Sequence, residues 1–176
     1  MTWRLTSIES AAVLLLGTAA GVFLIKKVLG MLKVCLFSPV KGIVVYKGQP
    51  VVGAVIERSY HWNWKDQKGG DQTVTDQNGE FSLPAIYAYL GHMKFVPHQP
   101  VIEQSILIQH EGATYGAWHY AKMEYGESEE LSVAVMRGRL PDLKGNPINL
   151  YCDLTAEVKN HGGSWGYGGL AELRES

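Results

Sequence analysis

The sequence predicts one small all-β sandwich domain that follows an amino-terminal membrane helix. The region after Lys41 alternates apolar and polar residues with period two, as half-buried strands do. The chain has 20 Gly, 7 Pro, 9 Tyr and 5 Trp, a composition that suits many short strands joined by turns. Residues 11–25 carry no charged side chain. We therefore divide the chain into four parts, namely a membrane anchor at 1–30, a linker at 31–40, the sandwich at 41–158 and a Gly-rich tail at 159–176.

The predicted anchor runs from Ala11 to Ile25 and is the segment we expect to contact the lipid bilayer. An uncharged run of this length is shorter than the ~20 residues of a perpendicular span, but the flanking Lys26 and Lys27 can snorkel to the interface. A cleaved signal peptide is the main alternative, although no convincing cleavage site precedes these lysines. A chain that started at Met31 would be a complete sandwich with no anchor.

The side of the membrane on which the sandwich lies is open from sequence alone. Four lysines follow the span, namely Lys26, Lys27, Lys33 and Lys41, and the positive-inside tendency favours the cytoplasm for them. A long carboxy-terminal domain can cross regardless of flanking charge. We expect a single-pass protein of the bacterial inner membrane with the periplasm slightly favoured for the sandwich and the cytoplasmic side as the alternative.

The first half of the domain reads as strands separated by turns. We expect strands at 42–46 and 51–60 joined by a Gly/Pro turn, a polar loop at 65–71, and a hairpin around the Asn78-Gly79 turn. In the second strand, one face is predicted to carry Ala54, Ile56, Tyr60, Trp62 and Trp64. The other face is predicted to carry Val55, Glu57, Ser59, His61 and Asn63.

The second half gives weaker strand patterns. Segments 101–110 and 114–123 flank Glu111-Gly112-Ala113 and predict a hairpin, which would place His119 opposite Gln104 or Ser105. Segments 131–136 and 148–154 are candidate closing strands, and 87–98 is expected to be a loop or a short helix. The tail from His161 to Gly169 is too rich in glycine to form an ordered element by itself.

Two blocks resemble a known family. They are Gly42-x-Val44 with Lys47-Gly48-Gln49-Pro50-Val51-x-Gly53-Ala54-x-Ile56, and Thr75-Asp76-x-x-Gly79-x-Phe81-x-Leu83-Pro84. Together they resemble the carboxypeptidase regulatory-like domain of the transthyretin-like (prealbumin-like) superfamily. The segment from Phe37 to Asp153 also resembles an uncharacterised family of small proteobacterial proteins. The resemblance implies a seven-stranded Ig-like sandwich and a non-catalytic role.

Several kinds of chemistry are disfavoured. The chain has 16 Lys and Arg against 17 Asp and Glu, a net charge of -1, which offers no basic surface for nucleic acid. Gly162-Gly163-Ser164-Trp165-Gly166 matches the nucleophile elbow, but no histidine follows it as a hydrolase triad would need. Hydroxyisourate hydrolases share the transthyretin-like fold, yet their Tyr-Arg-Gly-Ser end motif is absent from this carboxy terminus. We predict no enzyme activity and no cofactor.

Metal binding is also disfavoured. His110 and His119 share a predicted hairpin, but its register separates them by about five rungs, or roughly 15 to 20 Å. His92 and His98 lie close in sequence in a loop that has no carboxylate or thiol nearby. The two cysteines, Cys35 and Cys152, can form one disulfide in an oxidising compartment or stay as free thiols in a reducing one.

The aromatic stretch at 60–64 is the most unusual feature of the sequence. Its apolar rings can line the core, or its distal end can form a contact patch made of Tyr60, Trp62, Trp64, Lys65 and Asp66. Trp and Tyr dominate the hot spots of protein interfaces. We therefore expect a module that binds a protein partner, one form being an immunity-type protein that neutralises an interbacterial toxin. The alternative is an accessory envelope domain that binds glycan or a secretion complex.

Overall fold

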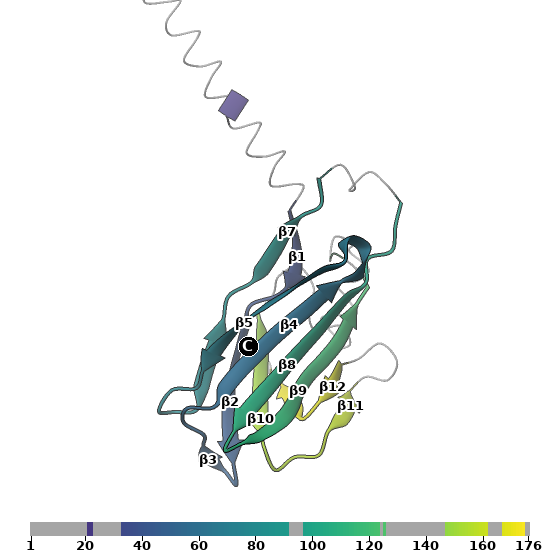
Figure 1. Cartoon of the computed structure of the whole chain (residues 1–176). Helices are drawn as coiled ribbons and strands as arrows, with labels where there is room; N and C mark the ends of the chain where they lie inside the picture. The colour runs from purple at the N-terminus through teal and green to yellow at the C-terminus, as the bar shows by residue number, and fades with distance from the viewer. Residues whose placement is uncertain are drawn as a thin grey trace, which may run out of the picture. The chain divides into compact units, whose positions relative to one another are not determined.

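The computed structural model describes residues 21–22, 33–91, 97–123, 125, 147–161 and 167–174 (Figure 1). The chain divides into two compact units, one made of residues 1–33 and 89–96 and the other of residues 34–88 and 97–176. Of the predicted membrane span, only the helical Gly21 and Val22 are described, and Met31 also lies outside the described residues. No helix among the described residues is long and apolar enough to cross a membrane.

The second unit confirms the predicted all-β, sandwich-like class. The described residues form thirteen strands in three sheets, whereas the resemblance implies seven. The difference arises partly because β3, β11, β12 and β13 are short strands of only two or three residues each. The smallest sheet pairs β1 (Lys33–Phe37) with β7 (Ile86–Tyr89), so part of the predicted 87–98 loop is a strand.

The six-stranded sheet is antiparallel throughout. Its order is β11 (Lys159–His161), β12 (Tyr167–Gly169), β9 (Ala113–Lys122), β8 (Ile102–His110), β4 (Val55–Trp62) and β5 (Gln67–Val74). The predicted β8–β9 hairpin is confirmed, and His119 pairs with Ser105 as expected. Positive φ angles at Glu111 (48°) and Gly112 (77°) give the two-residue turn the twist that a hairpin needs.

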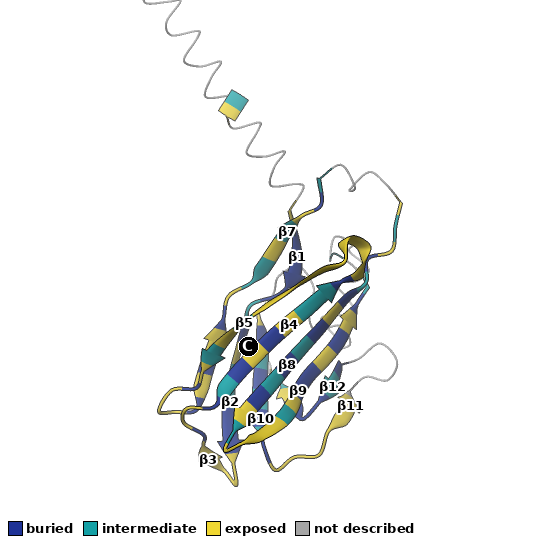
Figure 2. Cartoon of the chain, viewed as in Figure 1, coloured by how far each residue is buried: buried dark blue, intermediate teal, exposed yellow. Residues whose placement is uncertain are grey.

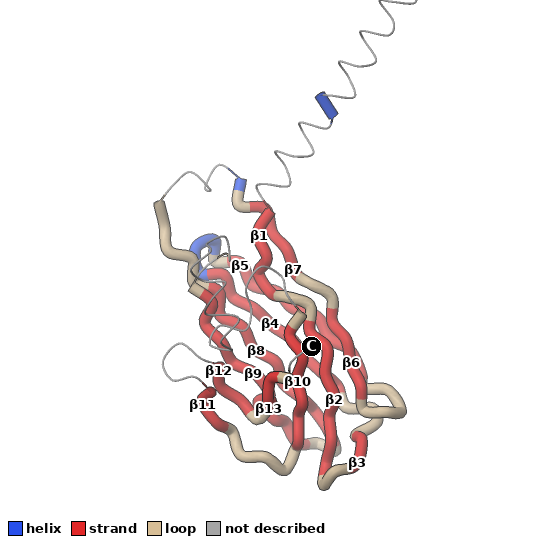
Figure 3. The backbone as a smooth tube through the Cα atoms, turned by 180° about the vertical axis from the view of Figure 1, so that it is seen from behind, coloured by secondary structure: helices blue, strands red, loops and turns tan. Residues whose placement is uncertain are grey.

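The five-stranded sheet faces away from the viewer in Figure 1 and is seen directly in Figure 3. It contains β13 (Ala171–Leu173), β10 (Ile148–Asp153), β2 (Val40–Tyr46), β3 (Gln49–Pro50) and β6 (Glu80–Leu83). Strand β10 confirms the predicted closing strand and pairs with β2 in parallel, while β6 pairs with β2 antiparallel. The other candidate closing strand, at 131–136, lies outside the described residues.

The predicted pairing of the first two long strands is wrong. The strand that follows the Lys47-Gly48 turn and pairs with β2 is only the two-residue β3, and the next strand starts at Val55 in the other sheet. The chain crosses between sheets at 51–54, where Thr75 holds it. The Thr75 hydroxyl donates to the Val51 carbonyl oxygen (2.7 Å) and accepts from the Ala54 amide (2.9 Å).

The polar loop expected at 65–71 is also wrong for most of its length. A one-turn 3-10 helix, η1 (Asn63–Lys65), is followed by Asp66 and then by β5, which pairs with the whole of β4. Period-two reasoning missed β5 because Gln67-Lys68-Gly69-Gly70 has no apolar residue. Edge strands are often polar, and this one is exposed along most of its length (Figure 2).

The turn at Asn78-Gly79 is present, but the predicted hairpin is not. Two backbone amides, those of Asn78 and Glu80, donate to the Asp76 carboxylate at 2.9 Å. The strands on either side diverge, because β5 ends in the six-stranded sheet and β6 begins in the five-stranded one. The Asn-Gly signal therefore marks a tight turn between layers.

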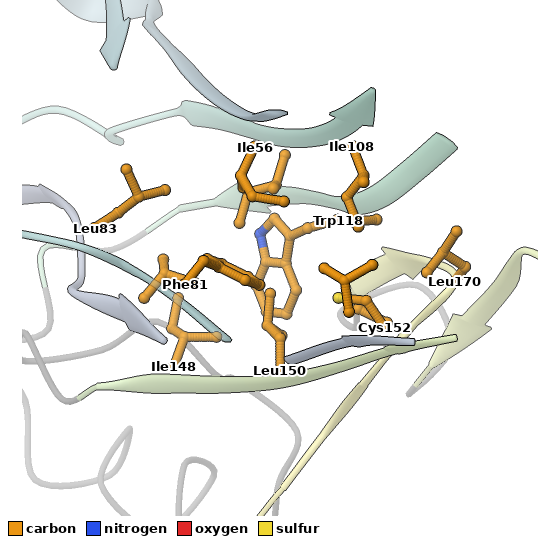
Figure 4. Packing of buried hydrophobic residues seen from close by; sticks show 14 of the residues in the cluster. Ile56, Phe81, Leu83, Ile108, Trp118, Ile148, Leu150, Cys152 and Leu170 are labelled. Carbon is orange, nitrogen blue, oxygen red and sulfur yellow. The ribbon is translucent and has the colours of Figure 1, made fainter. Parts of the chain in front are cut away.

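The core lies between the two larger sheets (Figure 4). Trp118 of β9 is buried there, with Ile56 and Ile108 of its own sheet on one side and Phe81 and Leu150 of the opposing sheet on the other. Burial of apolar area at about 25 cal/mol per Å² is the main force that holds such layers together.

The predicted Gly-rich tail contributes to this core. Three of its residues, Tyr167, Leu170 and Ala171, are buried, and Tyr167 stacks on Trp118 with ring centroids 4.4 Å apart. Strands β11 and β12 extend the six-stranded sheet, while β13 pairs with β10. The segment is ordered where it pairs with strands of the domain, and residues 162–166, which include the Gly-x-Ser-x-Gly match, lie outside the described residues.

Candidate functional site

The predicted contact patch lies where β4 passes through η1 into β5, and the structure divides its residues between core and surface. Trp62 is fully buried, whereas Trp64 keeps 39% of its surface exposed. Lys65 and Asp66 are exposed and Tyr60 is half-buried. We call the exposed group Trp64, Lys65 and Asp66 the tip; η1 and the turn after it are exposed in Figure 2.

The Trp64 side chain is held in place by other rings. It stacks on His98 with ring centroids 4.4 Å apart and planes inclined by 23°. His98 Nε2 lies 3.0 Å from the Tyr125 hydroxyl, and Tyr125 in turn meets the buried Trp62 edge to face at 6.0 Å. Burial raises the pKa of Tyr125 to about 12, so its hydroxyl stays protonated at neutral pH. An exposed indole that is already fixed loses little entropy when a partner covers it.

The two tip residues that follow Trp64 in the chain carry opposite charges, and each contacts a neighbouring side chain. The Lys65 ammonium lies 5.0 Å from the Trp62 ring centre, a cation–π distance. Asp66 adopts a left-handed conformation (φ 45°), and its carboxylate lies 2.9 Å from His61 Nε2. Glu103 approaches the other nitrogen of His61 at 3.6 Å. The tip therefore offers an exposed aromatic side chain followed in sequence by a cation and an anion, both exposed.

Tyr60 belongs to the margin between core and tip. Its ring lies against β5, where a Cβ on Gly69 would come within 2.8 Å of the phenol oxygen. The hydroxyl accepts a hydrogen bond from Gln67 Nε2 at 3.0 Å. Glycine at position 69 thus lets the edge strand pass under an aromatic ring.

Behind the tip lies a group of buried polar residues that sequence reasoning missed. Three of them, which we call the inner polar row, lie on the neighbouring strands β4, β8 and β9, and each donates to a backbone carbonyl in 35–38. They are Arg58 (to Ser38, 3.2 Å), Gln104 (to Leu36, 2.8 Å) and Lys122 (to Cys35, 3.1 Å). None is more than 1% exposed. The row attaches residues 35–38 to the six-stranded sheet by side chains.

Arg58 also contacts residues outside 35–38. Its guanidinium binds both carboxylate oxygens of Asp71 on β5 (2.9 and 2.7 Å) and the Pro84 carbonyl (2.6 Å). It also lies 4.9 Å from the Phe37 ring centre. The burial of Arg58 could have been predicted from the sequence. Residue 58 lies an even number of positions from Ile56 and Trp62, so all three point to the same, inward face of the strand.

The residues weighed for metal binding and redox chemistry lie apart. His119 pairs with Ser105 in mid-strand and His110 ends β8 opposite Ala113. In the part of the chain that the structure describes, no group of three or more His, Cys, Asp or Glu residues could hold a metal ion. Cys35 and Cys152 are both buried and are not joined by a disulfide, and burial raises the pKa of Cys152 to about 12.

Fold and site together define a sandwich-like all-β domain with a rigid aromatic tip. The family model described as Domain of unknown function (DUF6795) matches residues 40–157, and the chain belongs to this family. The match contains all the tip residues. No curated protein and no solved structure matches the chain.

Proposed function

We propose that this protein is a non-catalytic binding module whose tip docks onto a protein partner. The observation that carries the proposal is the fixed, exposed Trp64, flanked by Lys65 and Asp66 and supported from beneath by His98 and Tyr125. Interface hot spots are enriched in Trp and Tyr, and pre-organised side chains bind with a smaller entropic cost.

The wider setting of this function is part of the proposal. Residues 11–25 anchor the chain in the bacterial inner membrane, and the sandwich is a prealbumin-like, Ig-like domain of seven principal strands with the carboxypeptidase regulatory-like pattern. The support for this is the uncharged apolar run and the two sequence blocks between Gly42 and Pro84. A reporter enzyme fused to the carboxy terminus, active on only one side of the membrane, tests the anchor and its orientation.

One form of the function is an immunity-type protein that neutralises a toxin delivered between bacteria. In that form the partner is the toxin, its gene lies beside the gene of this protein, and the two products bind tightly. Co-expression tests it directly: the full chain should rescue cells that express the neighbouring toxin, and Trp64→Ala should not. Rescue by Trp64→Ala to the wild-type level would contradict tip docking.

The docking surface itself is tested by photo-crosslinking in cells, with a crosslinking amino acid placed at Lys65 of the full chain. We expect one discrete adduct that Trp64→Ala reduces at least tenfold, because a hot-spot truncation costs about 2 kcal/mol or more.

Tyr46 with Lys47 gives a matched control, since this tyrosine is also exposed (43%) and carries a lysine 5.1 Å from its ring centre. A crosslinker at Lys47 should not give the adduct, and Tyr46→Ala should leave the Lys65 adduct unchanged. Equal adducts from both positions would contradict the proposal.

A further inference from the structure

We infer that the outer face of the six-stranded sheet carries a site for one ring of a neutral sugar, separate from docking at the tip. A cavity of about 310 Å³ opens on this face, and its polar lining side chains are Ser59, His61, Lys68, Glu103, Ser105 and His119. We call it the outer hollow. Its volume lies at the small end of the roughly 300–1,000 Å³ found for ligand sites, which suits a single ring.

The hollow exists because one row of the sheet carries small side chains. Ser59 pairs with Gly70 on one side and with Ser105 on the other, and Ser105 pairs with His119. Gly70 cannot be enlarged in place, because a Cβ there would lie 2.1 Å from the Arg58 carbonyl oxygen. The depression is therefore bounded by strand pairing on the β5 side and by the His119 ring on the β9 side.

The next row of the sheet forms a polar rim. His61 pairs with Lys68 on β5 and with Glu103 on β8. The imidazole is fixed between two carboxylates, with Asp66 at 2.9 Å from Nε2 and Glu103 at 3.6 Å from Nδ1. Glu103 also accepts from Asn63 Nδ2 at 3.4 Å. Hydrogen-bonding groups are thus in place around the hollow before a ligand arrives.

The chemistry of floor and rim favours a sugar over an anion. Tyr60 pairs with Gln104 between the Ser59–Ser105 row and the His61–Glu103 row, and the lining there is mostly apolar, as the C–H face of a pyranose would require. The hollow combines a donor (Lys68), an acceptor (Glu103) and groups that do both (the serines and His119), which matches hydroxyls that donate and accept. A phosphate would meet the Glu103 carboxylate, and like charges repel.

The test is a titration of the full chain, kept in the sugar-free detergent lauryldimethylamine oxide, with N-acetylglucosamine and with methyl glucoside. With histidine-labelled protein, the ring signals of His61 and His119 should shift and saturate with a dissociation constant on the order of 1 mM. The signals of His110, which lies at the far end of β8, should not move. Trp64→Ala should leave these shifts unchanged, which separates this site from tip docking.

Variants decide whether the hollow is the site. Ser59→Val with Ser105→Val fills it with β-branched groups that strands accept, and should weaken binding at least tenfold with an unchanged melting curve. Thr114→Val removes an exposed hydroxyl from the opposite end of the same sheet and should bind as the parent does. Absence of saturable shifts with both sugars, or full binding by the double variant, would overturn the inference. Shifts induced by inorganic phosphate alone would replace it with an anion site.

Discussion

Both faces of the six-stranded sheet carry polar residues, but those of one face are buried and those of the other line an open cavity. On the inner face, Arg58, Gln104 and Lys122 are buried and donate to backbone carbonyls of residues 35–38. On the outer face, one residue along from the first two, Ser59 and Ser105 line an open cavity. A buried polar group that binds the protein's own backbone serves the fold, whereas a row that faces a cavity can serve a ligand.

Replacing Arg58 should give the largest loss of stability. Arg58→Met leaves the Ser38 and Pro84 carbonyls without this donor and separates Asp71 from its partner. We expect a loss of about 3 kcal/mol, at the lower end for a broken buried ion pair because Asp71 is partly exposed and can be hydrated. Urea denaturation followed by circular dichroism measures it. A loss below about 1 kcal/mol would show that the contacts of Arg58 contribute little.

Replacing Gln104 should have a smaller effect of the same kind. Gln104→Leu keeps the volume but removes the donor to the Leu36 carbonyl (2.8 Å), at a cost of about 1–2 kcal/mol. Gln109→Leu is the matched control, because Gln109 is an exposed glutamine on the same strand. The same denaturation series should give Gln109→Leu a value within about 0.5 kcal/mol of the parent. Equal losses for both variants would remove the distinction between the faces.

The buried Cys152 thiol, which faces the same core from the five-stranded sheet, gives a pH-dependent effect. Its pKa is raised from 9.0 to about 12 by burial, so the folded chain keeps a proton that the unfolded chain releases above pH 9. Stability should therefore be unaffected below about pH 8 and should fall as the pH rises from 9 towards 12. The decrease between pH 9 and 10 should be roughly 1 kcal/mol.

The pH series on Cys152→Ala isolates this contribution. The variant starts from a different stability, so the slope between pH 9 and 10 is the quantity to compare, and it should be shallower than in the parent. Burial also raises the pKa of Tyr125 and Tyr167, but the ordinary pKa of tyrosine is 10.0, so these two residues contribute mainly at higher pH. Parallel slopes would mean that the thiol ionises equally in both states.

A substitution on the outer face should change stability least. Glu103→Gln alters an exposed carboxylate whose partners, His61 and Asn63, are also near solvent, and exposed pairs contribute between 0 and about 1 kcal/mol. Thermal unfolding should shift by no more than the Gln109→Leu control. A loss as large as that of Gln104→Leu would mean that the outer row also serves the fold.

Local patterns predicted some parts of this molecule and not others. The β8–β9 hairpin followed from alternation and a glycine turn, because its contacts are between neighbours in sequence, and the pattern limited the partner of His119 to Gln104 or Ser105. The register shift between Ile106 and Leu107, which selects Ser105, was not predicted. The crossing at 51–54 and the parallel pairing of β2 with β10 depend on partners more than a hundred residues apart or in another layer. The role of Arg58 was missed because a charged residue is expected at the surface, although its position along β4 places it on the same inward face as Ile56 and Trp62.

The candidate site was only partly predicted, because it too depends on contacts between segments far apart in the sequence. The sequence has aromatic residues at 60–64 but does not distinguish the buried Trp62 from the exposed Trp64. Two residues apart, they would point to the same face of a continuous strand, but η1 ends the strand after Trp62. The support from His98 and Tyr125 comes from segments far along the chain. The outer hollow could not be predicted, because its residues come from four strands whose register must be known together.

Recognition of residues 35–38 through their carbonyl oxygens has a consequence for how this segment can evolve. Every residue has the same carbonyl group, so these three hydrogen bonds by themselves select no particular side chain in the stretch that leads into the domain. Burial is the remaining constraint, since residues 35–38 are all buried, so residues of similar size and polarity can replace one another there while the donors on β4, β8 and β9 stay unchanged. Related chains should therefore be easier to align by these three donors than by the residues they hold.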